Sequence, residues 1–291
     1  MKIALVTTLA SLVENRRIGE EIDALGHEFK LVDMSEFGFR IENGSLTVSQ
    51  FNDLKKVDVV IVRGVFLAIK TISEIVKSLR KKGTKIFDNN FLEHRYSIDK
   101  VTDIVKLAIN DIPVPDTLYS RDFAEYPRLA KRLDYPLVIK SSRMGKGAYV
   151  FKIENGQELA DFVRSIESEG KTAKSFLLQE FIEYKYDLRI LIIGKSAFTM
   201  RRIPVEGEFR ANFSLGGSVE EFELDEEGKN LAVSALEAVN MTVGGVDILI
   251  TEDDKRYVLE VNHTAGFVGM EKATGENIAK IYVEHAIANA K

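Results

Sequence analysis

Residues 244–267 read GGVDILITEDDKRYVLEVNHTAGF, and this stretch decides how the fold is interpreted. Two apolar runs flank a charged turn, a pattern typical of two antiparallel strands joined in a hairpin. Asp247 interrupts the first run, and Glu260 and Asn262 interrupt the second. These polar residues need a physical reason, because a buried carboxylate without a partner costs free energy.

The alternation of side chains along a strand assigns these residues to faces. Val258, Glu260 and Asn262 share one face of the second strand. A turn of either two or four residues in the EDDK segment places Asp247 directly opposite Glu260. Like charges that face one another across a strand pair destabilise it, so this pair needs to be neutralised.

Protonation is one way to neutralise the pair, and a hard divalent cation is the better one, because all three side chains offer oxygen ligands. Mg²⁺ suits a site that has few protein ligands and binds substrate phosphates. An ordinary hairpin with outward polar residues is the alternative, and a one-residue slip of register would separate the carboxylates. The pattern therefore favours a metal site, with the ordinary hairpin left open.

Cationic residues elsewhere could bind the phosphates of a nucleotide. Lys140 ends the apolar run PLVIK, and the glycine-bearing loop SSRMGKG follows it. Backbone N–H groups of such a loop can bind phosphate, although the P-loop motif is absent and a strand follows. Further cations follow in or near strand-like segments: Arg189, Arg201, Arg202 and Arg210. Each alone fits an exposed strand face, but together they predict an electrostatic clamp for phosphoryl transfer.

The composition of the whole chain bounds its class. With 291 residues, 45% hydrophobic and 29% charged, the chain is typical of a soluble globular protein of about two domains or three small ones. A net charge of -5 argues against a broad nucleic-acid footprint, and the absence of cysteine excludes disulfides and a thiolate nucleophile. The chain has no apolar run long enough to predict a signal peptide or a membrane span. We therefore expect a cytoplasmic protein without a membrane partner.

The order of the predicted elements suggests an α/β unit followed by α+β units. Apolar runs at 2–8, 28–33, 57–64 and 85–89 alternate with helical patterns at 12–27 and 68–83. This alternation predicts a parallel, doubly wound sheet over roughly the first 92 residues. A helix over residues 97–110, with Ser97 as N-cap, then leads to the proline-marked break DIPVPDT.

The remaining two thirds of the chain are predicted to mix strands and helices. We expect strands at 136–140, 148–153, 175–182, 187–194 and 196–205, and helices at 156–170, 226–240 and from about Glu276. The strands at 136–140 and 148–153 flank the glycine loop, so they are expected to form a hairpin.

The order of several short segments resembles the ATP-grasp superfamily, and within it the RimK-like glutamate ligases. In chain order the segments are VIK, the glycine loop, LLQEFI, DLR, GEFRANFSLGGS, GVDIL and EVNHTAGFVGMEKATGENIA. The resemblance runs from about Val57 through the C-terminal helix. It implies an α/β plus α+β architecture in which an open parallel sheet precedes two lobes that hold ATP between them. The expected units are residues 1–93, 94–180 and 181–291.

The resemblance also assigns residues to nucleotide and metal. It implies that Lys140 and Lys100 contact the ATP phosphates, that Glu180 and Phe181 frame the adenine, and that Asp187 contacts the ribose or another part of the nucleotide. The phosphates are expected to be lined by Arg210, Ala211 and Asn212. The implied Mg²⁺ ligands are Asp247, Glu260 and Asn262, with two ions expected and Mn²⁺ as a possible substitute. Arg189 and Arg201 are the expected catalytic cations.

Two segments depart from the usual pattern of the family. The glycine loop has Met144 where an additional glycine is common, with Arg143 and Lys146 beside it. His263 and Ala265 follow the metal strand where small residues and proline are usual, next to the expected acceptor pocket. The second departure leaves the identity of the acceptor open.

The activity that the resemblance implies is an ATP-dependent carboxylate–amine ligation through an acyl phosphate. Glutamate is the expected amine, and the acceptor is a carboxylate of a protein, peptide or coenzyme. Ligation of an amino acid on a carrier protein of lysine or arginine biosynthesis, a small-molecule kinase and a non-catalytic nucleotide-binding module remain alternatives. A homo-oligomer is expected from the family alone.

Overall fold

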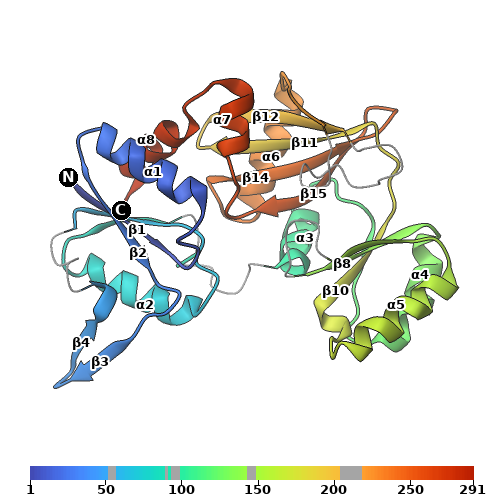
Figure 1. Ribbon diagram of the computed structural model, residues 1–291. Coiled ribbons are helices and arrows are strands. Elements are labelled where there is room, and N and C mark those ends of the chain that lie inside the picture. The colour runs from blue at the N-terminus through green and yellow to red at the C-terminus, as the bar shows by residue number, and fades with distance from the viewer. Residues whose placement is uncertain (52–56, 89–90, 93–98, 143–148, 204–217) are drawn as a thin grey trace.

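The computed structural model describes residues 1–291 except 52–56, 89–90, 93–98, 143–148 and 204–217. Within the described residues the chain forms three larger sheets and one separate hairpin. Figure 1 shows the N-terminal sheet at the left, the C-terminal lobe at the upper right and the central lobe at the lower right, with both chain ends at the N-terminal sheet. No helix in this part of the chain is long and apolar enough to cross a membrane.

The N-terminal sheet is parallel, with the strand order β2-β1-β5-β6. Its strands are β1 (Lys2–Thr7), β2 (Glu28–Asp33), β5 (Val59–Val62) and β6 (Lys85–Asp88). The central strands β1 and β5 are apolar almost throughout, as expected when helices cover both faces of a parallel sheet. This arrangement confirms the predicted doubly wound sheet.

Helices α1 (Val13–Ala24) and α2 (Ile69–Arg80) cover opposite faces of this sheet. In α2 the apolar residues recur every three or four positions and form one buried stripe, which is why the segment is helical and packs where it does. Helix α1 ends as predicted, with Gly26 in the left-handed conformation (φ 77°) just after the C-cap. The hairpin of β3 (Phe39–Glu42) and β4 (Ser45–Val48), which projects from the sheet, was not predicted.

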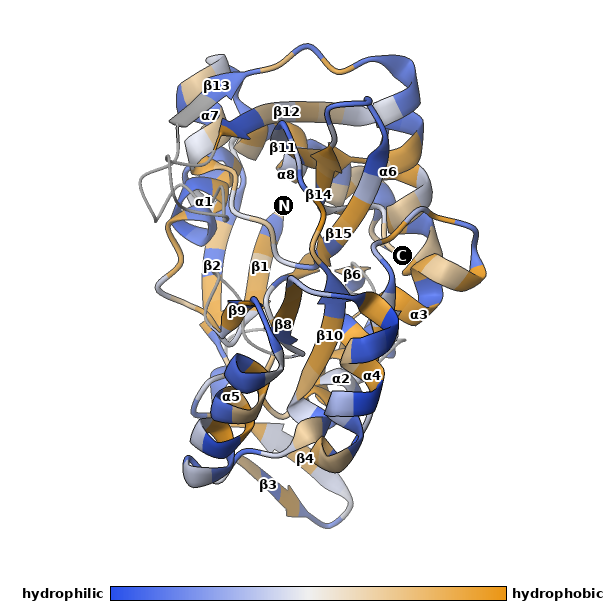
Figure 2. Cartoon of the chain, turned by 90° about the vertical axis from the view of Figure 1, so that its right-hand side faces the viewer, coloured by the Kyte–Doolittle hydropathy of each residue, from blue (hydrophilic) through white to orange (hydrophobic). Residues whose placement is uncertain are grey.

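The central lobe is an antiparallel sheet with the strand order β7-β10-β8-β9. Its strands are β7 (Thr117–Leu118), β8 (Leu137–Ser141), β9 (Val150–Ile153) and β10 (Phe176–Glu180). Helices α4 (Tyr126–Leu133) and α5 (Gly156–Ser168) pack on it through one apolar cluster. Figure 2 shows the contrast between the apolar strand β10 and the mixed surfaces of α4 and α5. The predicted hairpin of β8 and β9 is confirmed, whereas α4 was not predicted.

The C-terminal lobe contains a five-stranded antiparallel sheet with the order β13-β12-β11-β14-β15. Its strands are β11 (Tyr186–Ile193), β12 (Ser196–Ile203), β13 (Ser218–Glu221), β14 (Val243–Ile250) and β15 (Arg256–Asn262). Helix α6 (Glu226–Ala238) covers one face. The alternating residues Leu188, Ile190 and Ile192 of β11 point to α6, so Asp187 and Arg189 lie on the other face.

Helix α3 (Lys100–Ile109) begins two residues later than its predicted N-cap implies. Asp99 caps it, because the side chain of Asp99 accepts a hydrogen bond of 2.9 Å from the backbone N–H of Thr102. The predicted cap, Ser97, lies outside the described residues. Helix α3 packs against β15 and α6, with Leu107 in their shared core, and so belongs to the packing of the C-terminal lobe.

The last segment of the chain returns to the N-terminal sheet. Helix α7 (Val268–Thr274) precedes α8 (Ile278–Asn289), and α8 packs beside α1 (Figure 1). The backbone of Lys291 exchanges two hydrogen bonds, of 2.9 and 3.0 Å, with that of Ile86 in β6. The division into residues 1–93, 94–180 and 181–291 stays a prediction, since contacts of this kind cross it.

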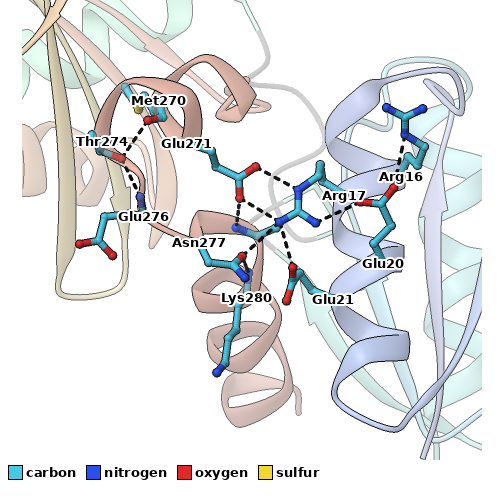
Figure 3. A network of polar contacts seen from close by, with 11 residues as sticks. Arg16, Arg17, Glu20, Glu21, Met270, Glu271, Thr274, Glu276, Asn277 and Lys280 are labelled. Atoms are coloured by element: carbon cyan, nitrogen blue, oxygen red, sulfur yellow. Dashed lines mark hydrogen bonds and ion pairs between the residues drawn. The ribbon is translucent and has the colours of Figure 1, made fainter.

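Arg17 of α1 joins the two ends of the chain through a network of ion pairs (Figure 3). Its guanidinium lies 3.1 Å from Glu271 of α7 and 2.9 Å from Glu21 of its own helix, and it donates to Asn277 at 3.2 Å. Because Glu271 lies in α7 and Asn277 caps α8, this network fixes both helices against α1.

We expect substitution of Ile18 in α1 to show how strongly this junction stabilises the fold. Ile18→Ala removes a fully buried side chain from the cluster shared by the N-terminal sheet, α1 and α8. The free energy of unfolding should fall by about 2–5 kcal/mol, because a cavity is left behind. Urea denaturation followed by far-UV circular dichroism measures the loss. Val13→Ala, at an exposed position of the same helix, serves as the control and should change stability by less than about 0.5 kcal/mol.

Candidate active site

The hairpin of β14 and β15 places two of the three predicted metal ligands side by side. Asp247 pairs directly with Glu260, and Asn262 pairs with Gly245. The pairing expected from strand alternation is therefore confirmed. A Cβ at Gly245 would lie 2.9 Å from that of Ala265, so the small residue opposite Asn262 leaves room for the following segment to fold back.

The register on the turn side differs from the prediction. Ile250 pairs with Arg256, so five residues connect the strands, where a turn of two or four was predicted. The backbone N–H of Thr251 donates to the carbonyl of Lys255 at 3.1 Å within this connection. A β-bulge next to Asp247 corrects the shift, because it adds one residue to β15 before Glu260.

The same bulge corrects the predicted position of Val258. Val258 pairs with Ile248 and is fully buried in the apolar cluster under α6, on the face opposite to the one predicted for it. Strand alternation failed here because an inserted residue reverses the face of every residue beyond it. Glu260 and Asn262 lie on the far side of the bulge from the turn and keep their predicted face.

Four charged residues from three adjacent strands form a buried cluster around Asp247. Arg189 of β11 donates two hydrogen bonds to the carboxylate, Nε to Oδ1 at 2.9 Å and Nη2 to Oδ2 at 2.6 Å. Arg202 of β12 lies 3.1 Å from the same carboxylate and also donates to Asp187. Asp187, Arg202 and Asp247 are all buried. Cross-strand pairing of β11 with β12 and with β14 produces this arrangement.

The cluster shifts the pKa values of its two carboxylates in opposite directions. Burial opposes ionisation of Asp247, but the guanidinium groups of Arg189 and Arg202 outweigh it and hold the pKa of Asp247 well below its usual range. Burial raises the pKa of Asp187 to about 6, although Arg202 opposes the rise. Asp247 is therefore an anion at neutral pH, as a metal ligand needs to be.

Arg201, a predicted catalytic residue, is not brought into this cluster. Its guanidinium lies 2.7 Å from Glu220 and 5.2 Å from the ring centre of Tyr186. Adjacent residues of a strand point to opposite faces, so Arg202 points toward Asp247 and Arg201 points away from it. The sequence alone did not show which of the two neighbouring arginines faces Asp247. The pairing of Arg202 with Asp187 shows that it is Arg202.

Two lysines approach Glu260 from other elements. Lys100, at the first turn of α3, places Nζ 3.1 Å from the carboxylate of Glu260. Its backbone N–H donates to the carbonyl of Ser142 at 2.9 Å, which ties α3 to the end of β8. Burial lowers the pKa of Lys140 in β8 to about 8, and Lys100 adds to the effect, while Glu260 and Asp247 oppose it. The structure thus brings together Lys100, Lys140 and the carboxylate pair.

The residues of the predicted metal site fit a hard cation. Asp247, Glu260 and Asn262 offer oxygen ligands from paired strands. The buried side-chain nitrogen of Asn262 has no hydrogen-bond partner among the described residues, so its amide is unengaged on that side. No group of three or more His, Cys, Asp or Glu in the described part of the chain could hold a metal. In the predicted set the third ligand would be an asparagine, and phosphates and water would complete the coordination.

The predicted adenine-framing residues lie where β10 ends. The backbone N–H of Glu180 donates to the carbonyl of Asp116 at 2.9 Å, and the side chain of Glu180 accepts from the N–H of Asp116 at 2.8 Å. Lys152 of β9 stacks over the ring of Phe181, 4.3 Å from its centre. Six residues singled out in the sequence lie outside the described residues: Arg143, Met144, Lys146, Arg210, Ala211 and Asn212.

The structure also shows a polar pair that the sequence did not reveal. His263 Nε2 lies 2.9 Å from the carboxylate of Asp103, and both side chains are buried. Asp103 lies one helical turn after Lys100 on α3, so this pair fixes the helix that carries Lys100 beside the metal strand. The i, i+3 spacing of Lys100 and Asp103 was the available signal, but nothing local linked it to His263.

Comparison with known families agrees with this geometry. Residues 97–286 match the RimK-like ATP-grasp domain, and residues 1–89 match the RimK PreATP-grasp domain. The fold is that of an ATP-grasp enzyme. The chain belongs to the RimK-like ATP-grasp family and is an ATP-dependent ligase of that type.

Curated relatives carry names from the glutamate ligases. The chain is 29% identical over 301 residues to a probable alpha-L-glutamate ligase of Legionella pneumophila (strain Corby). The alignment covers 100% of this chain and 97% of the relative. The chain is also 29% identical over 277 residues to human beta-citrylglutamate synthase B. This alignment covers 92% of this chain and 69% of the relative.

Solved structures with the same fold include peptide-bound enzymes. The ATP-grasp ligase PsnB complexed with a minimal precursor aligns with a TM-score of 0.72 at 20% identity, over 98% of each chain. The macrocyclase MdnC of Microcystis aeruginosa MRC, bound with its precursor peptide MdnA, aligns with a TM-score of 0.73 at 17% identity, over 99% of this chain and 100% of that one. At this identity the likeness shows the fold.

Substitution of the two neighbouring arginines should separate their roles. Arg202→Met leaves Asp187 buried without its cation, so the free energy of unfolding should fall by about 3–5 kcal/mol. Arg201→Met removes a partly exposed pair with Glu220, which should cost no more than about 1 kcal/mol. Urea denaturation of both variants measures the difference. Equal losses would contradict the assignment of Arg202 to the buried cluster.

Nucleotide affinity should depend on the protonation of Lys140. Because its pKa is about 8, the ammonium group is mostly protonated at pH 7 and mostly neutral at pH 9. A bound phosphate favours the protonated form, so the Kd of an ATP analogue should rise about tenfold from pH 7 to pH 9. Isothermal titration calorimetry with Mg²⁺ and AMP-PNP measures it. Lys140→Arg, which does not titrate in this range, should abolish the dependence; an unchanged slope in that variant would argue against Lys140.

Proposed function

We propose that this protein joins a carboxylate to an amine at the expense of ATP, through an acyl phosphate. The observation that carries the proposal is the convergence of cations and carboxylates on one face of the C-terminal sheet. Arg189 and Arg202 surround Asp247, and Lys100 approaches Glu260 from α3. Alternating charges of this kind suit phosphoryl transfer, in which charge on the phosphate oxygens needs to be stabilised.

ATP is proposed to bind between the lobes formed by residues 94–180 and 181–291. Glu180 and Phe181 would frame the adenine at the end of β10, and Asp187 would lie on the nucleotide side of β11. Arg210, Ala211 and Asn212 would line the phosphates. The boundaries of the lobes and these contacts rest on the family resemblance and on the positions of β10 and β11.

Lysines 100 and 140 are proposed to bind phosphate oxygens. Mg²⁺ at Asp247, Glu260 and Asn262, as two ions with Mn²⁺ as a substitute, would supply charge neutralisation between the β- and γ-phosphates. Lys100 Nζ lies 3.1 Å from the carboxylate of Glu260. A phosphate oxygen bound by Lys100 would therefore lie next to a proposed metal ligand.

The reaction proceeds in two transfers. An oxygen of the acceptor carboxylate attacks the γ-phosphorus, the bond to the β–γ bridging oxygen breaks, and ADP leaves. The nitrogen of the amine then attacks the acyl carbon, phosphate leaves, and a proton is released. Arg202 lies on the same face as Asp247 and replaces Arg201 as the proposed second cation beside Arg189. No side-chain nucleophile is required, so catalysis consists mainly of positioning and charge stabilisation.

Glutamate is the proposed amine. Its support is the set of relatives whose names denote an alpha-L-glutamate ligase, beta-citrylglutamate synthase and N-acetylaspartylglutamate synthase. The proposed acceptor is a carboxylate of a peptide, protein or small molecule, since structural neighbours hold precursor peptides. Transfer to an amino-acid carrier protein and phosphorylation of a hydroxyl are alternative outcomes of the test below.

We expect ADP release to require Mg²⁺, L-glutamate and a carboxylate acceptor. A panel of glutamyl-terminated peptides, citrate and N-acetylaspartate, with products read by mass spectrometry, should yield an acceptor heavier by one glutamyl residue. A stable product heavier by one phosphoryl group without any amine would instead show a kinase.

Glu260→Gln should lower ADP release by about 10²–10³-fold, because it removes charge from the metal face. Glu252→Gln provides the matched control, since Glu252 is an exposed residue in the turn of the same hairpin. Equal activity of the two variants would remove the metal site from the proposal.

A further inference from the structure

Arg63 is a buried cation that none of the residues assigned above explains. It follows β5 and is 4% exposed. Nη1 donates to the side-chain oxygen of Asn15 at 2.8 Å, and Nη2 donates to the backbone carbonyl of Ala265 at 2.8 Å. Both partners are neutral. No carboxylate in the described part of the chain makes an ion pair with Arg63, although Glu14 acts on it at longer range.

A guanidinium group stays protonated even when burial lowers its pKa, as it does for Arg63. A buried charge without a counter-ion is costly, whereas a carboxylate can pair with a guanidinium through two parallel hydrogen bonds. Arg63 has five N–H groups, of which two serve the neutral partners just described. Its two hydrogen-bond partners therefore supply no anion in direct contact with the guanidinium.

The position of Arg63 in the sheet points to a ligand. In the strand order β2-β1-β5-β6, the connections through α1 and α2 leave β1 and β5 for opposite faces. Ligands of open parallel sheets bind at the carboxyl ends of the strands where the connections diverge in this way. Arg63 follows β5 there, and Thr8, which follows β1, donates from Oγ1 to the carbonyl of Gly64 at 3.1 Å.

The segment that follows the metal strand closes over this position. A Cβ at Gly64 would lie 3.3 Å from Cγ2 of Thr264, and one at Gly266 would lie 2.9 Å from Oε1 of Glu14. A cavity of about 20 Å³ lies between the end of β5 and the segment that follows β15. Its lining includes Arg63, His263 and Thr264. The hydroxyl of Thr264 is buried and has no partner among the described residues.

We propose that Arg63 and Thr264 form a carboxylate-binding subsite for a substrate of the ligase, next to Asn262. The proposal rests on the proposed function and identifies one anchoring group of that site. A space of this size is large enough for one carboxylate oxygen or one water molecule. The carboxylate comes either from the amino acid that supplies the amine or from the acceptor.

Calorimetry on protein loaded with Mg²⁺ and AMP-PNP separates the two sources without requiring turnover. L-Glutamate is the probe for the amine side, and N-acetylated triglutamate, which has no free amine, is the probe for the acceptor side. L-Glutamine and the α-amide of glutamate test which carboxylate is bound. Wild type should bind at least one carboxylate probe more tightly than its amide counterpart.

Arg63→Gln should weaken binding of that probe by at least about 30-fold, the effect of removing one partner of a buried charge pair. Arg63→Lys should restore part of the affinity, and the Kd of AMP-PNP should be unchanged in both. Arg17→Gln is the matched control, because it weakens the junction of α1 and α7 without lining the cavity. It should bind the probe as wild type does.

Several results would overturn the proposal. Unchanged probe binding by Arg63→Gln would leave a buried water as the only occupant, and failure of wild type to bind either probe would remove the subsite. A parallel loss of AMP-PNP affinity, or an equal loss in Arg17→Gln, would show a purely structural role. Ligase turnover by wild type together with any of these results would sink this inference and leave the proposed function intact.

Discussion

The pairing of the buried Asp247 carboxylate with two arginines is the interaction on which the rest of the site depends. Arg189 and Arg202 come from different strands, and both need to reach one carboxylate on a third. Buried charges are tolerated only when they are paired. A slip of register in any of these strands would leave two cations and an anion apart in an apolar sheet. The register of the sheet is therefore needed for the charge pairing, and the charge pairing in turn favours that register.

The junction between the N-terminal sheet and the end of the chain is the second constraint. Helix α8 completes the apolar cluster on one face of that sheet, and Arg17 holds α7 against α1. Arg63 binds the carbonyl of Ala265, three residues after Asn262. The segment next to the metal strand is thus held from the N-terminal unit. Changes at the carboxyl ends of β1 and β5 can alter this side of the site without disturbing the cluster around Asp247.

Sequence reasoning predicted the pairing of Asp247 with Glu260 from two local properties, strand alternation and the repulsion of opposed carboxylates. Those properties sufficed for Asp247 and Glu260, but not for Val258, because a β-bulge adds a residue without a distinctive pattern. They also could not choose between Arg201 and Arg202. That choice follows from the pairing of β11 with β12, which local periodicity does not encode.

The sequence by itself determined the type and order of most elements, the parallel N-terminal sheet and the residue types at the metal face, because periodicity and charge are local properties of the chain. Only the tertiary structure decided that α3 packs on the C-terminal lobe, that α8 returns to the first sheet, and that Asp103 meets His263. These contacts join segments up to hundreds of residues apart. They result from burying apolar faces against one another, so no single stretch of sequence contains them.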